Sequence, residues 1–185
     1  MIPKNASMSF RTIGIFEHQK GKTWNRNPDG LYTWHSYKNI PPDAVTILIL
    51  RDPFKRLVSS YQYNCRKPHM YWKGITYTFN QYLKRIESGI FIATDIPQIY
   101  YIRSREIDLT KVTEIMLVED LPKQFIEFKN KYNLEDVCLN FENKSLTEQK
   151  KQINIELSQE DNTRIFNKIY KEDITLYEYI KNENK

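Results

Sequence analysis

The chain has 185 residues, of which 40% are hydrophobic and 28% are charged, so the composition excludes a disordered protein. Lys and Arg outnumber Asp and Glu by 28 to 23, and the resulting charge of +5 suits an anionic ligand but is too small to indicate nucleic acid. A chain of this length is expected to form one domain, residues 1–185, around one core.

No run of about 18 apolar residues is present, so no membrane span is predicted. The first residues lack the basic and apolar segments of a signal peptide. The sequence as given therefore predicts a soluble, cytoplasmic protein, and it leaves the oligomeric state open. No His, Cys and Asp residues have the spacing of metal ligands, so no metal is expected.

In chain order, the first feature is the stretch IPKNASMS, residues 2–9. If a short strand precedes it and a helix begins at Phe10, backbone N–H groups converge there and favour a phosphate. Lys4 adds a positive charge, and the hydroxyls of Ser7 and Ser9 add donors. The same residues also suit an ordinary turn that leads into a helix cap.

The clearest predicted strand is VTILIL, residues 45–50, whose continuous apolar run is typical of a parallel strand covered on both faces. A helix is predicted directly after it, with Asp52 as its cap and Pro53 at its first position. The apolar stripe of this helix consists of Leu57, Val58 and Tyr61.

Further elements follow from periodicity and capping signals. A loop is predicted over Cys65–Tyr77, and a strand over Glu114–Glu119. The predicted helices are Phe79–Ile86, about Pro122–Tyr132, one that carries Ile165 and Ile169 after the Ser158/Asp161 capping box, and Asp173–Asn182. Strands followed by helices predict an α/β fold with a central, mostly parallel sheet flanked by helices.

The stretch LRDPFKRLVSSY places Arg51 where the first predicted strand ends and Ser59 eight residues later, inside the helix. Ligands of open α/β sheets bind outside the carboxyl ends of the strands, and arginine offers a rigid fork for a phosphate. Alternatively, Arg51 pairs with Asp52 or a helix carboxylate, and Ser59 is an ordinary helix residue.

Together, PKNASMS and RDPFKRLVSSY resemble the two nucleotide-binding motifs of the sulfotransferase superfamily, especially of its carbohydrate and heparan-type branch. Four later stretches are also similar to segments of that branch: IPQIYYI (96–102), MLVEDL (116–121), ENKSL (142–146) and IYKEDITLYEY (169–179). The resemblance implies a three-layer P-loop-like fold. It also implies 3′-phosphoadenosine-5′-phosphosulfate (PAPS) as the sulfuryl donor, without a metal.

The resemblance also implies a role for each residue. Lys4 contacts the 5′-phosphate and the bridging oxygen, Arg51 and Ser59 bind the 3′-phosphate, and Lys144 and Ser145 close over that end of the nucleotide. The phosphosulfate is held by the backbone amides of Asn5, Ala6, Ser7, Met8 and Ser9.

Two of these residues also suit an ordinary structural role, and two features depart from the family pattern. Ser145 also forms a capping box with Glu148, and Lys144 also suits a solvated surface. Met8 stands where the family usually has threonine, which removes one hydroxyl contact. The strand before the loop is almost absent, so either it is a stub or the sequence begins downstream of the natural start.

His35 is the predicted general base, because the carbohydrate branch often has a histidine in this interval and imidazole accepts protons near neutral pH. Alternatively, His35 is packed against its aromatic neighbours. His18 is the second choice of base and Glu17 a weaker one, while His69 is placed to face the acceptor.

These residues predict in-line sulfuryl transfer from PAPS to an acceptor hydroxyl, and a saccharide is the favoured acceptor. One alternative is a P-loop kinase, but GxxxxGK[ST] is absent, and only Glu119 and Asp120 follow an apolar strand as magnesium ligands. The other alternative is a nucleotide- or glycan-binding protein of the same fold without turnover.

Overall fold

The computed structural model describes residues 45–66, 77–104, 106–134 and 160–183. Within these ranges it contains two strands, five α-helices and one 3-10 helix. In chain order they are β1 (Ile47–Leu50), α2 (Pro53–Arg66), α4 (Phe79–Glu87), α5 (Gln98–Ser104), η2 (Leu109–Lys111), β2 (Glu114–Leu117), α6 (Leu121–Tyr132) and α8 (Glu160–Glu183).

β1 and β2 form a parallel pair in which Ile47 lies opposite Glu114 and Leu50 opposite Leu117. Successive side chains of a strand point to opposite faces, and both faces here are apolar. Leu48, Leu50 and Leu117 pack against α5 and α8, and Ile49 and Met116 pack against α6. The predicted α/β class and parallel pairing are therefore confirmed for the described strands.

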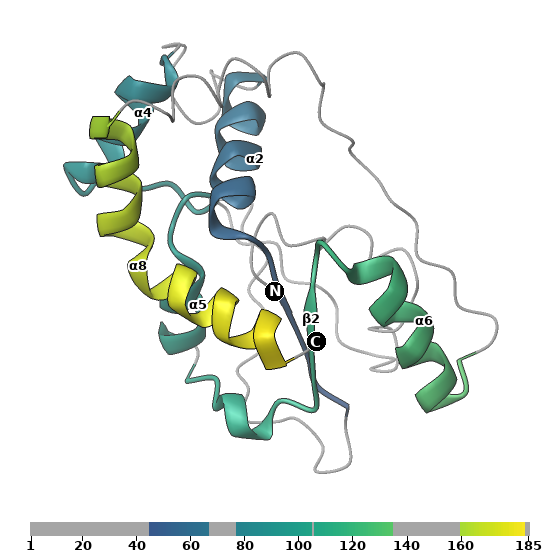
Figure 1. Ribbon diagram of the computed structural model, residues 1–185. Helices are drawn as coiled ribbons and strands as arrows, with labels where there is room; N and C mark the ends of the chain where they lie inside the picture. Colours follow the sequence, from purple (N-terminus) through teal and green to yellow (C-terminus); the bar gives the residue numbers. More distant parts are fainter. Residues whose placement is uncertain (1–44, 67–76, 105, 135–159, 184–185) are drawn as a thin grey trace, which may run out of the picture.

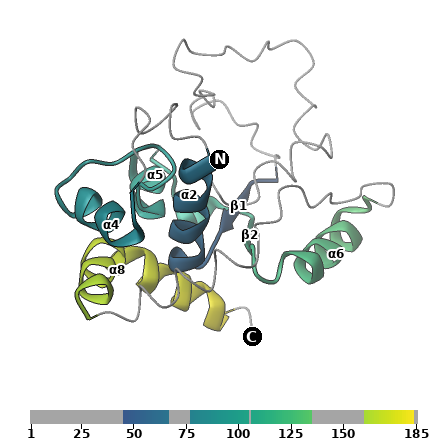
Figure 2. The same ribbon diagram turned by 90° about the horizontal axis from the view of Figure 1, so that it is seen from above.

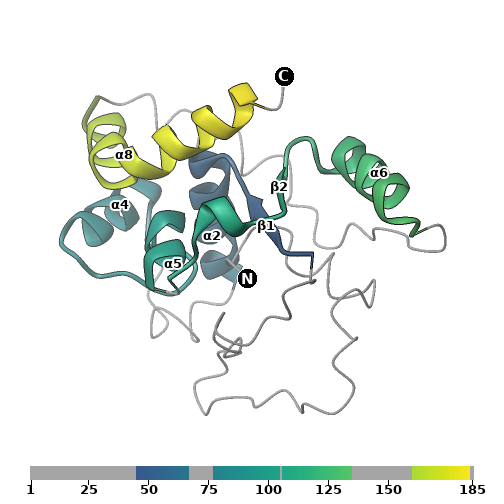
Figure 3. The same cartoon turned by 90° about the horizontal axis from the view of Figure 1, so that it is seen from below.

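The helices are divided between the two faces of the strands (Figure 1). Of the described helices, only α6 lies on one side, where Leu121, Phe125 and Phe128 cover Ile49 and Met116. α5 and α8 lie on the other side together with α2, which directly follows β1, and with α4 farther from the strands, and the same division is seen from above and from below (Figures 2 and 3). The two faces of the strand pair are thus covered by helices from different parts of the chain.

A second core joins α2, α4 and the first half of α8. The side chains of Leu57, Phe79, Leu83 and Ile165 are almost fully buried there. Local signals fix the ends of α4. A capping box between Thr78 and Gln81 begins it, and Gly89 follows its end at φ 85°, a conformation that favours glycine.

Helix α8 bends at Tyr170, whose dihedral angles (φ −103°, ψ 15°) are not helical. The sequence predicts two helices here, and the structure joins them across this bend. Residues before the bend, such as Ile165, pack on α2 and α4, whereas Tyr177 and Ile180 pack on the strands and α5. One helix therefore serves both cores.

One predicted boundary needs correction, and one helix is not predicted from the sequence. Cys65 is predicted to begin a loop but is helical, because Cys65 and Arg66 are the last residues of α2. Helix α5 is not predicted, although IPQIYYI contains most of it. The predicted capping residue Ser158 lies outside the described residues. Asp52 does cap α2, since its Oδ1 accepts the Lys55 N–H at 2.8 Å.

The packing of the α4 core generates a stability prediction. Ile86 is 1% exposed, so Ile86→Ala leaves a cavity and should lower the free energy of unfolding by about 2–5 kcal/mol in urea titrations. Ile126 of α6 is 60% exposed and serves as the matched control, with an expected change within about 0.5 kcal/mol. Equal losses for the two variants would contradict this assignment of the core.

Candidate functional site

The turn between β1 and α2 lies beside the end of β2. Arg51 and Asp52 follow β1, and Glu119 lies two residues after the end of β2. The Asp52 N–H donates to Glu119 Oε2 at 3.2 Å, so the two strand ends are joined by a hydrogen bond. Ligands of parallel sheets bind at this edge, which makes it the candidate site.

One side chain forms hydrogen bonds with both the backbone N–H and the backbone carbonyl of Arg51. The Arg51 N–H donates to Gln98 Oε1 at 3.1 Å, and Gln98 Nε2 donates to the Arg51 carbonyl at 2.8 Å. Gln98 is the first residue of α5 and is 1% exposed. This pair of hydrogen bonds fixes the direction in which the Arg51 side chain leaves the turn.

The Arg51 guanidinium lies in a partly desolvated position. Burial is the main cause that lowers its pKa, and the nearby Arg56 charge acts in the same direction, while Glu119 and Asp52 counteract them. Arginine keeps its proton despite such a shift. A cation that has reduced hydration and a fixed backbone is suited to bind an anion through charge-assisted hydrogen bonds.

The two serines of α2 differ in their surroundings. Ser60 is fully buried, lies 3.0 Å from the Tyr82 hydroxyl and donates to Thr94 Oγ1 at 2.7 Å. Ser59 is half-buried, in the second turn of α2. Ser60 therefore has a packing role, and Ser59 remains the serine that is predicted to meet a ligand.

Of the predicted site residues, the structure describes Arg51 and Ser59 and brings them onto one strand–turn–helix unit. The others lie outside the described residues: Lys4, Asn5, Ala6, Ser7, Met8, Ser9, His35, Lys144 and Ser145, and likewise Glu17, His18 and His69. Their roles stay predictions.

The residues that hold the Arg51 turn carry no clear signal in the sequence. Gln98 is part of the IPQIYYI stretch, but that likeness implies no role for it. Asp173 is 1% exposed inside α8, where an aspartate is normally solvated, and its carboxylate accepts two N–H groups of α5. Only the IYKEDITLYEY stretch, which contains Asp173 and Tyr177, marks this part of the chain.

A second buried carboxylate, Asp95, lies between α4 and α5. Its Oδ2 pairs with Arg85 at 2.7 Å and its Oδ1 accepts the Ile92 N–H at 2.6 Å, while the Tyr170 hydroxyl donates to its carbonyl. Burial raises the pKa of Asp95 to about 6, against the lowering effects of Ile92 and Arg85. Since its partners come from surrounding helices and the adjoining loop, Asp95 is assigned a structural role.

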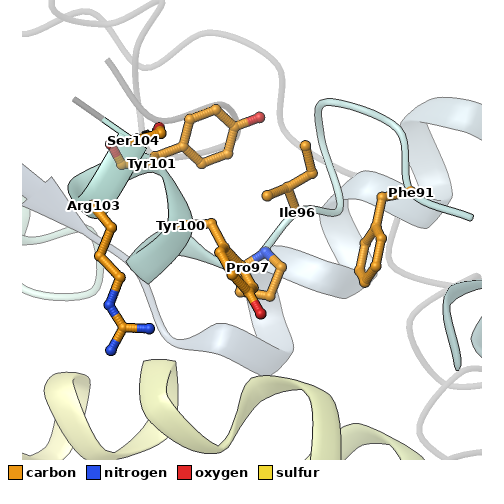
Figure 4. Close-up of a pocket in the computed structure, with 7 residues that line it drawn as sticks. All are labelled: Phe91, Ile96, Pro97, Tyr100, Tyr101, Arg103 and Ser104. Carbon is orange, nitrogen blue, oxygen red and sulfur yellow. Dashed lines mark hydrogen bonds between the residues drawn. The ribbon is translucent and has the colours of Figure 1, made fainter. Parts of the chain in front are cut away.

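An apolar pocket of 670 Å³ lies on the outer side of α5 (Figure 4). Tyr100 is 55% exposed and Phe91 36% exposed at its wall. The charge of Arg103 is already paired with Glu172 of α8. Its lining consists of Phe91, Ile96, Pro97, Tyr100, Tyr101, Arg103 and Ser104. The pocket therefore offers aromatic surface and no unbalanced charge.

No protein-family model matches the chain, and comparisons with curated proteins and with solved structures give no significant match. Within the described ranges, no helix is both long and apolar enough to cross a bilayer. The described residues also contain no group of three His, Cys, Asp or Glu side chains arranged around a metal position. A function for the chain is therefore inferred from its own residues.

The buried Asp95 generates a pH prediction. Its pKa is about 6 in the folded protein and 3.8 ordinarily, so the folded state holds more protons between these values. The free energy of unfolding should therefore fall by on the order of 3 kcal/mol as pH rises through this window.

Urea unfolding at a series of pH values between about 4 and 7 measures this slope. In Asp95→Asn the free energy of unfolding should fall less over the same pH window, by the contribution of Asp95, because the residue no longer titrates. Burial also raises the pKa of Asp173 and adds to the slope in both proteins, so their difference isolates Asp95. An unchanged slope in Asp95→Asn would refute the prediction.

Proposed function

We propose that the chain is a sulfotransferase that transfers the sulfuryl group of PAPS to an acceptor hydroxyl of a saccharide. The observation that carries the proposal is the position of Arg51 at the end of a buried parallel strand, with Ser59 on the following helix. These two residues belong to the RDPFKRLVSSY motif, which follows PKNASMS in the order that the sulfotransferase resemblance requires.

The surroundings of Arg51 fit a phosphate. Its guanidinium has lost hydration, its backbone is fixed by Gln98, and the N-terminus of α2 adds a partial positive charge. The Glu119 carboxylate balances part of this charge while it accepts the Asp52 N–H. In the proposal, Arg51 and Ser59 bind the 3′-phosphate of the donor, within a three-layer P-loop-like fold.

The donor supplies an activated sulfuryl group when it is bound. In the proposed mechanism Lys4 and the backbone amides of residues 5–9 stabilise the negative charge that develops on the leaving phosphate oxygen. His35 accepts the proton of the attacking acceptor hydroxyl, and His18 is the alternative base. Lys144 and Ser145 cover the 3′-phosphate end of the nucleotide.

The proposal has two competitors. A P-loop kinase would use Glu119 and Asp120 for magnesium, but Glu119 Oε2 already accepts hydrogen bonds from the Asp52 N–H and the Tyr177 hydroxyl, which disfavours this use. A nucleotide- or glycan-binding protein without turnover is favoured by Met8, which lacks the hydroxyl that the family has at this position.

The first test is ligand stabilisation. Adenosine 3′,5′-bisphosphate without magnesium should raise the Tm by several degrees in thermal unfolding, and adenosine 5′-monophosphate should raise it less. Arg51→Ala should remove most of the difference between the two nucleotides, and Ser59→Ala should reduce it. Lys55→Ala removes an exposed cation from the same helix and should leave the difference intact.

Two results would contradict the proposal. Stabilisation by ATP with magnesium, but not by the bisphosphate, would favour the kinase. If Arg51→Ala lowers the Tm increase from the bisphosphate and from the monophosphate by equal amounts, this residue does not bind the 3′-phosphate.

The second test is turnover of PAPS over a panel of saccharide acceptors. Lys4→Ala and His35→Ala should each lower kcat by about 10²–10⁴-fold, because each removes a group that acts in the transition state. The bisphosphate should still bind to His35→Ala, and His18→Ala tests the alternative base: a loss of kcat in His18→Ala but not in His35→Ala would assign the role to His18. Full activity of both Lys4→Ala and His35→Ala would refute their roles, and bisphosphate binding without turnover would favour the non-catalytic protein.

A further inference from the structure

The Arg51–Asp52 turn is held from two sides by side chains of other elements. On one side, Gln98 of α5 makes hydrogen bonds of 3.1 and 2.8 Å to the N–H and carbonyl of Arg51. On the other side, Glu119 accepts the Asp52 N–H at 3.2 Å. Two consecutive residues of the turn are therefore fixed, although the turn itself has no regular secondary structure.

Gln98 and Glu119, the two residues that hold the turn, are both hydrogen-bonded to helix α8. The Asp173 carboxylate accepts the Gln98 N–H on Oδ2 at 2.7 Å and the Ile99 N–H on Oδ1 at 2.8 Å. Tyr177, one turn further along α8, donates its hydroxyl to Glu119 Oε2 at 3.1 Å. Figure 1 shows this half of α8 running beside α5 toward the strands. One helix face thus supports the end of β1 and the end of β2.

The side chains that make these contacts are largely shielded from water. Gln98 and Asp173 are each 1% exposed and Tyr177 is 4% exposed. Burial, followed by the charge of Glu119, raises the pKa of the Tyr177 phenol above its ordinary value, so the hydroxyl keeps its proton and donates. The Gln98 N–H to Asp173 hydrogen bond is fully buried and the others are partly buried, and hydrogen bonds shielded in this way hold a turn in one geometry better than exposed ones.

We propose that Gln98, Asp173 and Tyr177 are positioning residues of the anion site at Arg51. Gln98 and Asp173 set the direction of the Arg51 side chain, and Tyr177 fixes the Glu119 carboxylate that balances its charge. This inference rests on the proposed function, because it takes the anion to be the 3′-phosphate of the donor. A binding group held in its productive geometry loses less conformational entropy when the ligand arrives.

The test compares two nucleotides by isothermal titration calorimetry. Gln98→Met keeps the length of the side chain and removes both hydrogen bonds to Arg51. It should weaken adenosine 3′,5′-bisphosphate about tenfold and change adenosine 5′-monophosphate by less than about twofold. Asp173→Asn and Tyr177→Phe should shift the affinity ratio in the same direction. Tyr179→Phe, an exposed position on the same helix, is the matched control and should not shift it.

A purely structural role would lower the affinities for both nucleotides together or lower only the Tm, and either result overturns the inference. If Gln98→Met does not fold, Tyr177→Phe decides alone, because it removes a single oxygen atom. Arg51→Ala separates the two proposals. If Arg51→Ala loses the preference for the bisphosphate and the positioning variants keep it, only this inference fails. If the parent protein shows no such preference, the proposed function fails and this inference with it.

Discussion

The Asp173 carboxylate is buried within the core and accepts the N–H groups of the first two residues of α5. A charge removed from water is costly unless it is paired, so this contact strongly favours one placement of α5 against α8. The apolar packing of Tyr177 and Ile180 on the strands supports the same placement. The position of Gln98, and through it the Arg51 turn, follows from this constraint.

Much of the described fold is predictable because its signals are local. The apolar runs of β1 and β2 indicate buried parallel strands, and the Asp52–Pro53 pair marks the start of α2. Helix α5 is missed because it has only seven residues, and the acceptor for its first N–H groups lies 75 positions further along the chain. The two helices predicted near the end of the chain correspond to the two halves of α8, which meet at the non-helical Tyr170. The hydrogen bond from the Tyr170 hydroxyl to the Asp95 carbonyl is not predictable, because it joins residues 75 positions apart.

The candidate site shows the same division. Arg51 is predictable because it directly follows a strong strand signal, and Ser59 is predictable from its spacing in the motif. Gln98 and Asp173 are not, because glutamine and aspartate are usually solvated and nothing local says otherwise. The spacing of Tyr177 with Ile174 and Ile180 indicates its buried face, but nothing local indicates its hydrogen bond to Glu119. Their roles arise from pairings between segments 47, 75 and 58 positions apart.

The residues that support the Arg51 turn are synthesised after it. Gln98 is added 47 positions after Arg51, and Asp173 another 75 positions after Gln98. At about 5–20 residues per second, a nascent chain emerges with the turn on the order of ten seconds before α8 exists to hold α5 in place. Until then the contacts from Asp173 and Tyr177 are absent, so on a ribosome-bound chain the proposed anion site lacks its support from α8 even after β1 and α2 have formed.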